Sequence, residues 1–285
     1  MNTTTPPDAS PVLRVAGRPV GRYHTRPELP ARLSPRPYLH PVTTLAGTAV
    51  TESGPADHPH HLGVGVAVPD VEGHNFWGGR TFVRDQGPTE LANHGAQRHS
   101  AFRPVDPGGF TEELRWVAAG GELLRERRTV AATGLTDEAW ALDFTFALTN
   151  TTPKPLSLGS PATNGRPGAA YGGFFWRARR ESGAPRVLTA DAEGEEAVHG
   201  ARADWLALSG EDWTLVFAGA TERTRRDPWF VRTSAYPGVG SSLAHTERLA
   251  VGPGETVVRR IVTVVADGTL GRGEAAALVR RAVSP

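Results

Sequence analysis

Apolar and polar residues alternate along much of this chain, and a period of two is typical of a β-strand with one buried face. The clearest stretch is 140–148, in which every second residue is large and apolar: Leu142, Phe144, Phe146 and Leu148. Asp143, Thr145 and Ala147 lie between them. This alternation predicts a half-buried strand in an antiparallel sheet.

Strand-like runs continue along the whole chain and are separated by Gly- and Pro-containing turns. Only residues 274–283 have helical spacing, with Ala275, Leu278, Val279 and Ala282 on one face. We therefore expect one all-β domain over residues 12–285 with a short C-terminal helix, preceded by a disordered leader over residues 1–11. The predicted strands are Val12–Val15, Val20–Tyr23, Tyr38–Val42, Thr48–Thr51, Val64–Val68, Phe110–Ala118, Leu123–Ala131, Trp140–Asn150, Leu156–Leu158, Phe174–Arg177, Trp205–Leu208, Trp213–Ala218, Trp229–Thr233 and Val257–Val265.

The composition limits the catalytic groups, metal ligands and partners that the chain can have. The 285 residues include no cysteine, which excludes disulfides, zinc–thiolate sites and a thiol nucleophile, so a metal site would need His, Asp or Glu. The formal net charge of +1 argues against a nucleic-acid partner. No apolar run approaches the roughly 18 residues of a membrane helix, so we expect no membrane partner. The N-terminus has no signal-peptide core, which favours a cytoplasmic location.

Three of the ten histidines lie within four positions, in the run Asp57-His58-Pro59-His60-His61. Neutral imidazole is both a common metal ligand and a good proton carrier near neutral pH. If this backbone is extended, His58 and His60 project to one face and His61 to the other. Pro59 disfavours a central strand, so we place the cluster on an edge or a loop before Val64. The alternative is a His-rich surface turn without chemistry.

Four runs stand out along the chain: Arg36-Pro37-Tyr38-Leu39-His40-Pro41, Asp57-His58-Pro59-His60-His61-Leu62-Gly63, Phe76-Trp77-Gly78 and Pro228-Trp229-Phe230-Val231-Arg232. Together they resemble a bacterial family of unknown function that has carried the label "methane oxygenase PmoA". The resemblance extends from about Arg36 to Gly268. A membrane-bound methane oxygenase subunit does not fit this chain, which has no segment able to span a bilayer.

A second, fold-level resemblance is to the galactose-mutarotase-like antiparallel β-supersandwich. The stretch 142–156, with Asn150 and a Thr-Thr-Pro-Lys-Pro turn, resembles a strand–turn–strand unit of that superfamily, and 249–255 resembles its late turn. The resemblance implies a groove that handles sugars, although fold alone does not fix function. Aldose epimerases of that superfamily place a catalytic Glu on the strand that matches Trp229–Thr233. No carboxylate is present there, so ordinary mutarotation is not expected.

The histidines of the resemblance supply the candidate chemistry. His40, His58, His61 and His99 could converge on a divalent metal, or His58 and His61 could act without metal as general acid and base. For His40 and His99 taken singly, the alternative is a structural role. Arg232 is the candidate for orienting substrate, and Glu126 is the first carboxylate to consider as a base, against the alternative of a solvated strand face. Arg177, Trp77 and Trp229 are candidate substrate contacts, against the alternative of core packing.

These residues predict a carbohydrate-active enzyme that acts on a sugar or oxidised sugar by His-based proton transfer, as an epimerase or lyase, with or without a divalent metal. Two alternatives stay open: a non-catalytic sugar-binding or regulatory module, and a metal-dependent oxygenase. The expected partner is a sugar-like small molecule.

Overall fold

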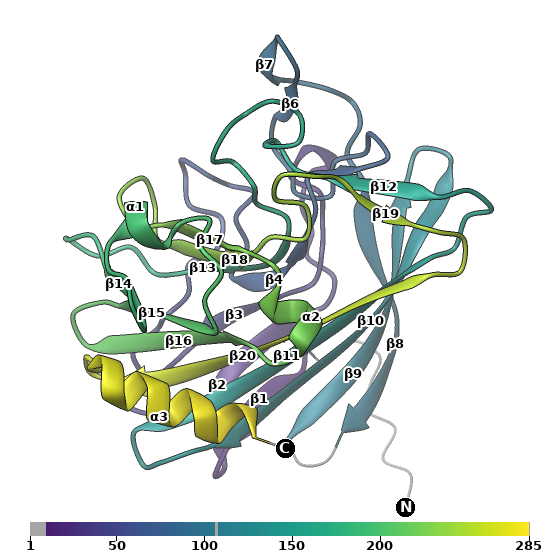
Figure 1. Ribbon diagram of the computed structural model, residues 1–285. Coiled ribbons are helices and arrows are strands. Elements are labelled where there is room, and N and C mark those ends of the chain that lie inside the picture. The colour runs from purple at the N-terminus through teal and green to yellow at the C-terminus, as the bar shows by residue number, and fades with distance from the viewer. Residues whose placement is uncertain (1–9, 106–107, 285) are drawn as a thin grey trace, which may run out of the picture.

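The computed structural model describes residues 10–105 and 108–284, and every strand pair within them is antiparallel. Two large sheets lie face to face (Figure 1). The seven-stranded sheet consists, in spatial order, of β1 (Val12–Val15), β2 (Arg18–His24), β3 (Tyr38–Val42), β4 (Val64–Ala67), β13 (Gly173–Arg177), β18 (Gly238–Ser241) and β17 (Trp229–Arg232). The eight-stranded sheet consists of β14 (Arg186–Thr189), β15 (Trp205–Ser209), β16 (Trp213–Gly219), β20 (Thr256–Asp267), β11 (Ala139–Asn150), β10 (Gly121–Gly134), β9 (Gly109–Ala118) and β8 (Ala96–Val105).

Smaller elements decorate these sheets. A three-stranded sheet contains β19 (Leu249–Val251), β12 (Leu156–Gly159) and β5 (Asp70–Val71), and a hairpin contains β6 (Thr81–Val83) and β7 (Gly87–Thr89). The helices are a 3₁₀ turn (Ala31–Leu33), α1 (Glu195–Val198), α2 (Glu222–Arg225) and α3 (Arg272–Val283). The expected all-β antiparallel supersandwich with a short C-terminal helix is confirmed. No helix in the described part of the chain is both long and apolar enough to cross a bilayer.

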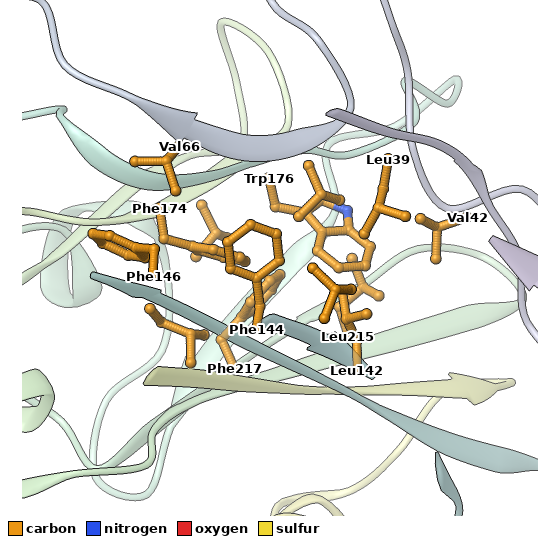
Figure 2. Packing of buried hydrophobic residues seen from close by; sticks show 14 of the residues in the cluster. Leu39, Val42, Val66, Leu142, Phe144, Phe146, Phe174, Trp176, Leu215 and Phe217 are labelled. Atoms are coloured by element: carbon orange, nitrogen blue, oxygen red, sulfur yellow. The ribbon is translucent and has the colours of Figure 1, made fainter. Parts of the chain in front are cut away.

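The main core fills the space between the two large sheets (Figure 2). Phe144 and Phe146 project from β11 toward Phe174 and Trp176 of β13, and all four are fully buried. Burial of each such side chain contributes about 1.5–3 kcal/mol, so the alternation that predicted the strands also provides the contacts that hold the sheets together.

Each sheet also has a covered outer face. On the eight-stranded sheet, Ala275 and Val279 of α3 pack against Val262 and Val264 of β20. On the seven-stranded sheet, the outer face carries a separate cluster that is mainly aromatic: Ala67, Trp77, Phe175 and Phe230, with Tyr171 and Tyr236 packed against it. This aromatic cluster positions the candidate site.

The predicted strands match observed ones with one exception. Residues 48–51 form no strand, because Thr51 uses its hydroxyl to accept a hydrogen bond from the backbone of Val42 and only an isolated bridge joins Thr43 to Ala49. The sequence patterns missed β8, an edge strand without clean alternation, and the short strands β5, β6, β7, β14, β18 and β19. Most of the expected leader, residues 1–9, lies outside the described residues.

Candidate functional site

Strand alternation decides which side chains reach the outer face of the seven-stranded sheet. On β13, Phe174 and Trp176 face the core, so Phe175 and Arg177 face outward. On β17, Trp229 faces the core and donates from Nε1 to the carbonyl of Ala203 at 2.8 Å. Phe230 and Arg232 therefore face outward, and both line a cavity of about 600 Å³.

Aromatic rings from separate parts of the chain form the wall of this cavity. Trp77 packs on Tyr171 with ring centroids 4.5 Å apart, and its ring lies 4.8 Å from that of Phe175. Tyr171 in turn contacts Phe230 at 5.5 Å, and Tyr236 completes the wall. A hollow of this size is within the range of small-molecule sites, and here an aromatic wall faces histidines and charged side chains.

The histidine run lies on the same cavity as a pair of tight turns rather than an extended strand. The backbone N–H of His58 donates to the carbonyl of Pro55, and that of His61 donates to the carbonyl of His58. The turns bring all three rings together: His61 lies 4.6 Å from His58 and 4.7 Å from His60, measured between ring centroids. The backbone is thus not extended, so His61 does not face away from the other two rings, and the predicted placement on a loop before Val64 is confirmed.

One buried arginine holds this turn against its neighbours. Arg36 donates from NH2 to the carbonyl of His60 at 2.7 Å and from NH1 to the carbonyl of Trp77 at 2.9 Å. It also contacts the carbonyls of Leu33 and Ser34. Burial lowers the pKa of Arg36 to about 9, so the guanidinium still carries its charge at pH 7. Three chain segments are thus fixed at one corner of the cavity by charge-assisted hydrogen bonds.

Two consecutive glycines make room for the His60 ring. Gly78 and Gly79 have φ of +98° and +69°, a backbone region that favours glycine. A Cβ atom on Gly79 would lie 2.9 Å from the His60 ring. The side chain of Asn75 accepts from the backbone N–H groups of Trp77 and Gly78, each at 2.8 Å, and so fixes the turn.

His61 is held by a charged pair behind the cavity. NH1 of Arg177 lies 3.3 Å from Nδ1 of His61, and the other guanidinium nitrogens donate to Oε2 of Glu52 at 2.9 and 2.7 Å. Because arginine can only donate, Nδ1 of His61 acts as the acceptor and the proton of the neutral ring is assigned to Nε2. Arg177 itself is fully buried and stacks under Tyr236, so it supports His61 instead of contacting a ligand.

The other two imidazoles differ in exposure. Burial, together with the nearby charge of Arg36, lowers the pKa of His60 to about 3. Burial and the adjacent imidazoles also lower the pKa of His61 well below 6.5, so both rings are neutral at pH 7. The His58 side chain is 32% exposed; its Nδ1 lies 3.2 Å from Oδ2 of Asp57. That nitrogen has no well-aligned hydrogen bond within residues 10–105 and 108–284.

Arg232 reaches the cavity as the sequence predicted. It donates from NH2 to the carbonyl of Gly168 at 2.7 Å and from NH1 to that of Val231 at 2.8 Å. Its guanidinium stacks on the ring of Phe230, 4.6 Å from the centroid. These contacts hold the guanidinium in one orientation, and its remaining N–H groups are not used by the two backbone carbonyls.

The expected convergence of four histidines on a metal does not occur. His40 binds the hydroxyl of Thr51 at 3.0 Å and does not line the cavity. His99 binds Oε1 of Glu112 at 2.8 Å and lines a different cavity, of about 680 Å³. No group of three or more His, Asp and Glu side chains among the described residues is arranged to hold a metal ion, so the prediction of a site at His40, His58, His61 and His99 is wrong.

Glu126 and Trp229 are structural residues. Glu126 is fully buried between the sheets, where both its oxygens accept from Arg128 at 2.7 and 2.9 Å and one also accepts from Trp116. Only its neighbours Arg125 and Arg127 face solvent. The prediction of Glu126 as a base is wrong because a sealed carboxylate cannot reach a ligand, and Trp229 is excluded from the cavity by facing the core.

The sequence patterns missed several cavity residues. His60 lies within the predicted histidine run but is not among the predicted site residues. Strand alternation predicts Phe230, since it shares a strand face with Arg232. Tyr171, Tyr236 and Arg166 lie on loops without any periodic signal.

The sequence matches a family model over residues 10–280, described as "Family of unknown function (DUF6807)", a description without any methane-oxygenase label. No curated protein matches the chain. Among solved structures, the α-galactosidase from Lactobacillus brevis matches with a TM-score of 0.36 and 7% identity, over 83% of this chain and 33% of that chain. The chain thus spans about a third of that enzyme's length. From the family match over almost its entire length, the chain belongs to the family of unknown function DUF6807.

Proposed function

We propose that the protein is a carbohydrate-active enzyme that binds a sugar or oxidised sugar in the aromatic cavity and moves a proton through His58 and His61. The observation that carries this proposal is the meeting of three imidazole rings with Trp77 and Arg232 at one cavity of about 600 Å³. Aromatic walls suit the apolar faces of a sugar ring, and neutral imidazoles suit general acid–base catalysis.

In this proposal His58 is the base. The carboxylate of Asp57, 3.2 Å from Nδ1, favours the tautomer whose proton is on Nδ1 and whose Nε2 is the acceptor. His58 takes the proton from a carbon next to a carbonyl group, and the electron pair of that C–H bond moves onto the carbonyl oxygen. The Nε2–H of His61 donates to the developing oxyanion, as a fixed donor in a partly dehydrated site.

The intermediate then has two outcomes. Delivery of a proton from solvent to the opposite face of the carbon, with loss of the imidazolium proton of His58 to solvent, gives an epimer. Departure of a β-substituent with its bonding pair, protonated by the imidazolium of His58, gives a lyase product. Both outcomes conserve atoms and need no oxidant.

The test is exchange of carbon-bound hydrogen in D₂O, followed by ¹H NMR with a panel of hexoses, hexonates and keto sugars. We expect signal loss at one carbon with the wild-type protein and at least a hundredfold slower loss with His58→Gln. His245→Gln serves as the matched control, because His245 lies outside the cavity lining. Binding without exchange on every sugar would instead indicate a sugar-binding module, and no binding at all would end the proposal.

A further inference from the structure

The cavity has an excess of positive charge. Four arginines and two carboxylates line it. Both carboxylates are already paired: Glu90 with Arg80 at 3.1 Å, and Asp57 with Arg180 at 3.1 Å. Arg32 and Arg166 form no ion pair with a carboxylate in the part of the chain that the structure describes.

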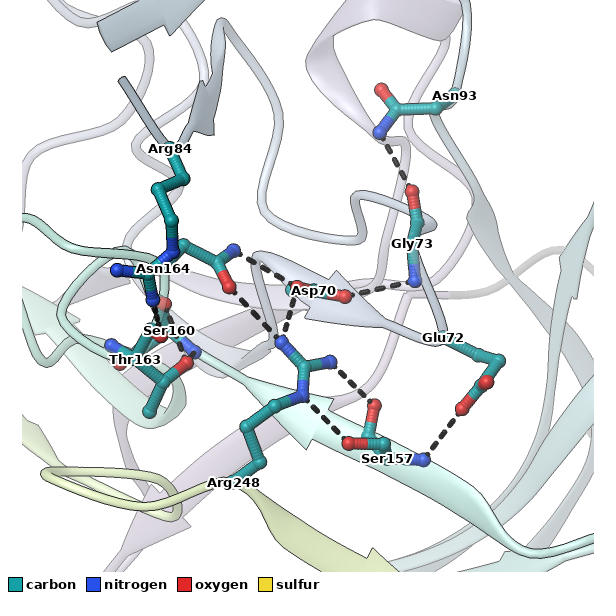
Figure 3. A network of polar contacts seen from close by, with 10 residues as sticks. All are labelled: Asp70, Glu72, Gly73, Arg84, Asn93, Ser157, Ser160, Thr163, Asn164 and Arg248. Carbon is teal, nitrogen blue, oxygen red and sulfur yellow. Dashed lines mark hydrogen bonds and ion pairs between the residues drawn. The ribbon is translucent and has the colours of Figure 1, made fainter. Parts of the chain in front are cut away.

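Polar contacts of Thr163 and Asn164 fix the loop segment just before Arg166 (Figure 3). Asn164 donates to Oδ2 of Asp70 at 2.9 Å, and Arg248 donates to the same oxygen at 2.7 Å. Arg84 donates to the carbonyl of Thr163 at 3.0 Å. Because the loop ties to β5 and to the β6–β7 hairpin at once, the backbone that carries Arg166 is ordered before any ligand binds.

Arg232 has donors to spare. Its hydrogen bonds to the carbonyls of Val231 and Gly168 use two of the five N–H groups of a guanidinium. The nearest carboxylate, Oε1 of Glu195, lies 3.7 Å from NH1. The other oxygen of Glu195 already accepts from the backbone and hydroxyl of Thr233 at 2.7 and 2.9 Å.

The charge of these arginines faces neutral groups. The rings of His60 and His61 are uncharged at pH 7, and the aromatic wall carries no charge. Glu195 offsets part of the charge of Arg232, but Arg32 and Arg166 have no carboxylate partner among the described residues. Their excess positive charge above a low-dielectric wall attracts an anion and disfavours a second cation.

From this juxtaposition we propose that the ligand is an acidic sugar: a ring that packs on the aromatic wall and bears an anionic group, carboxylate or phosphate, bound by Arg166 and Arg232 with Arg32 at the rim. This rests on the proposed function and names its substrate class. A guanidinium fork matches both anions, so the two sources of charge are separated by experiment.

Isothermal titration compares three sugar sets on the full chain: neutral hexoses, the corresponding hexuronates, and hexose 6-phosphates. We expect one anionic set to bind at least tenfold more tightly than the neutral set, with an advantage that shrinks between 50 and 300 mM NaCl because salt screens the rim. The set that binds more tightly identifies the anionic group.

Substitutions then identify which arginines bind the anionic group of the sugar. Arg32→Gln/Arg166→Gln changes two exposed side chains, so the fold is retained, and we expect at least tenfold weaker binding of the anionic sugar. Arg232→Gln should do the same. Arg127→Gln, an exposed arginine on β10, is the matched control with unchanged affinity.

The outcomes separate the two proposals. Equal affinity for neutral and anionic sugars, or unchanged affinity in the Arg32→Gln/Arg166→Gln variant, overturns the acidic-sugar inference and leaves the proposed function standing. Absence of binding by all three sets overturns both.

Discussion

Nδ1 of His61 lies 3.3 Å from NH1 of Arg177, and the same guanidinium donates to Glu52 on its far side. The guanidinium thus controls which nitrogen of the ring carries the proton, without itself lining the cavity. Arg177 was predicted from the sequence as a substrate contact, but this geometry makes it a positioning residue.

Replacement of Arg177 tests this role. Arg177→Met keeps an unbranched side chain about as long as the arginine stem up to Nε and removes every donor. We expect the Nε2–H tautomer of His61 to lose its dominance, and proton exchange on substrate to slow at least tenfold while ligand affinity changes less than threefold. Long-range ¹H–¹⁵N NMR of the imidazole reports the tautomer directly. An unchanged tautomer in the variant would show that Arg177 only fills space.

His60 makes stability depend on pH. Its folded-state pKa of about 3 lies below the ordinary 6.5, so the unfolded chain binds a proton in the interval between them and the folded chain does not. The free energy of unfolding therefore falls as pH decreases through 6.5, by about 2 kcal/mol at pH 5 from this ring alone. His61 shifts in the same direction.

Urea unfolding at pH 7 and pH 5 measures this loss. His60→Gln removes the titrating group, so the difference between the two pH values should shrink by about 2 kcal/mol relative to wild type. The interval from pH 5 to pH 7 lies above the range in which most carboxylates titrate. The change in the free energy of unfolding over this interval therefore reports mainly on histidines. The same loss in the variant as in wild type would assign the pH dependence to other groups.

Glu126 should matter for stability and not for catalysis. Glu126→Ala leaves the fully buried Arg128 without its paired carboxylate, and removing one member of a buried ion pair costs about 3–5 kcal/mol. Chemical denaturation should show this loss, while ligand affinity of the folded fraction stays at the wild-type value. A stable variant that had lost turnover would restore Glu126 as a catalytic candidate.

The Gly79 position should be sensitive for two separable reasons. Gly79→Ala introduces both a strained positive φ and a contact with the His60 ring at 2.9 Å. Gly73→Ala is the matched control, with φ of +83° and no atom within 4 Å of the new Cβ. Both should lose about 1 kcal/mol of stability from backbone strain. Only Gly79→Ala should also weaken ligand binding, measured by titration. Equal binding by the two variants would show that the position of His60 is unimportant.

Much of the fold follows from alternation, because a strand between two layers must present large apolar residues to one side. The stretch 140–148 specified both a strand and its buried face. Alternation does not reveal an edge strand such as β8, because few of its side chains are buried on either face and no apolar pattern is required. Short strands such as β14 and β18 are defined by their neighbours' backbone groups more than by their own side chains.

The same alternation applies to the site. Arg232 and Phe230 share a face, so Trp229 necessarily points the other way, and the sequence alone could have excluded it. His58 and His61 are predicted because three histidines lie within four positions of the sequence. Residues so close along the chain stay near one another in any backbone conformation. The partners of His40 and His99 could not be foreseen, because Thr51 and Glu112 reach them only through tertiary packing.

Strand β8 ends the eight-stranded sheet, and no strand among the described residues pairs with its outer side, although the N–H of Gln97 donates to the carbonyl of Pro35 at 2.9 Å. Three features of β8 hinder pairing of this edge with a further strand: a register shift between His99 and Ala101, exposed Arg98 and Arg103, and Pro104, which has no backbone N–H. A neighbouring molecule that tried to extend the sheet there would meet charge, curvature and a missing donor, so the border resists fibril-like growth at high concentration.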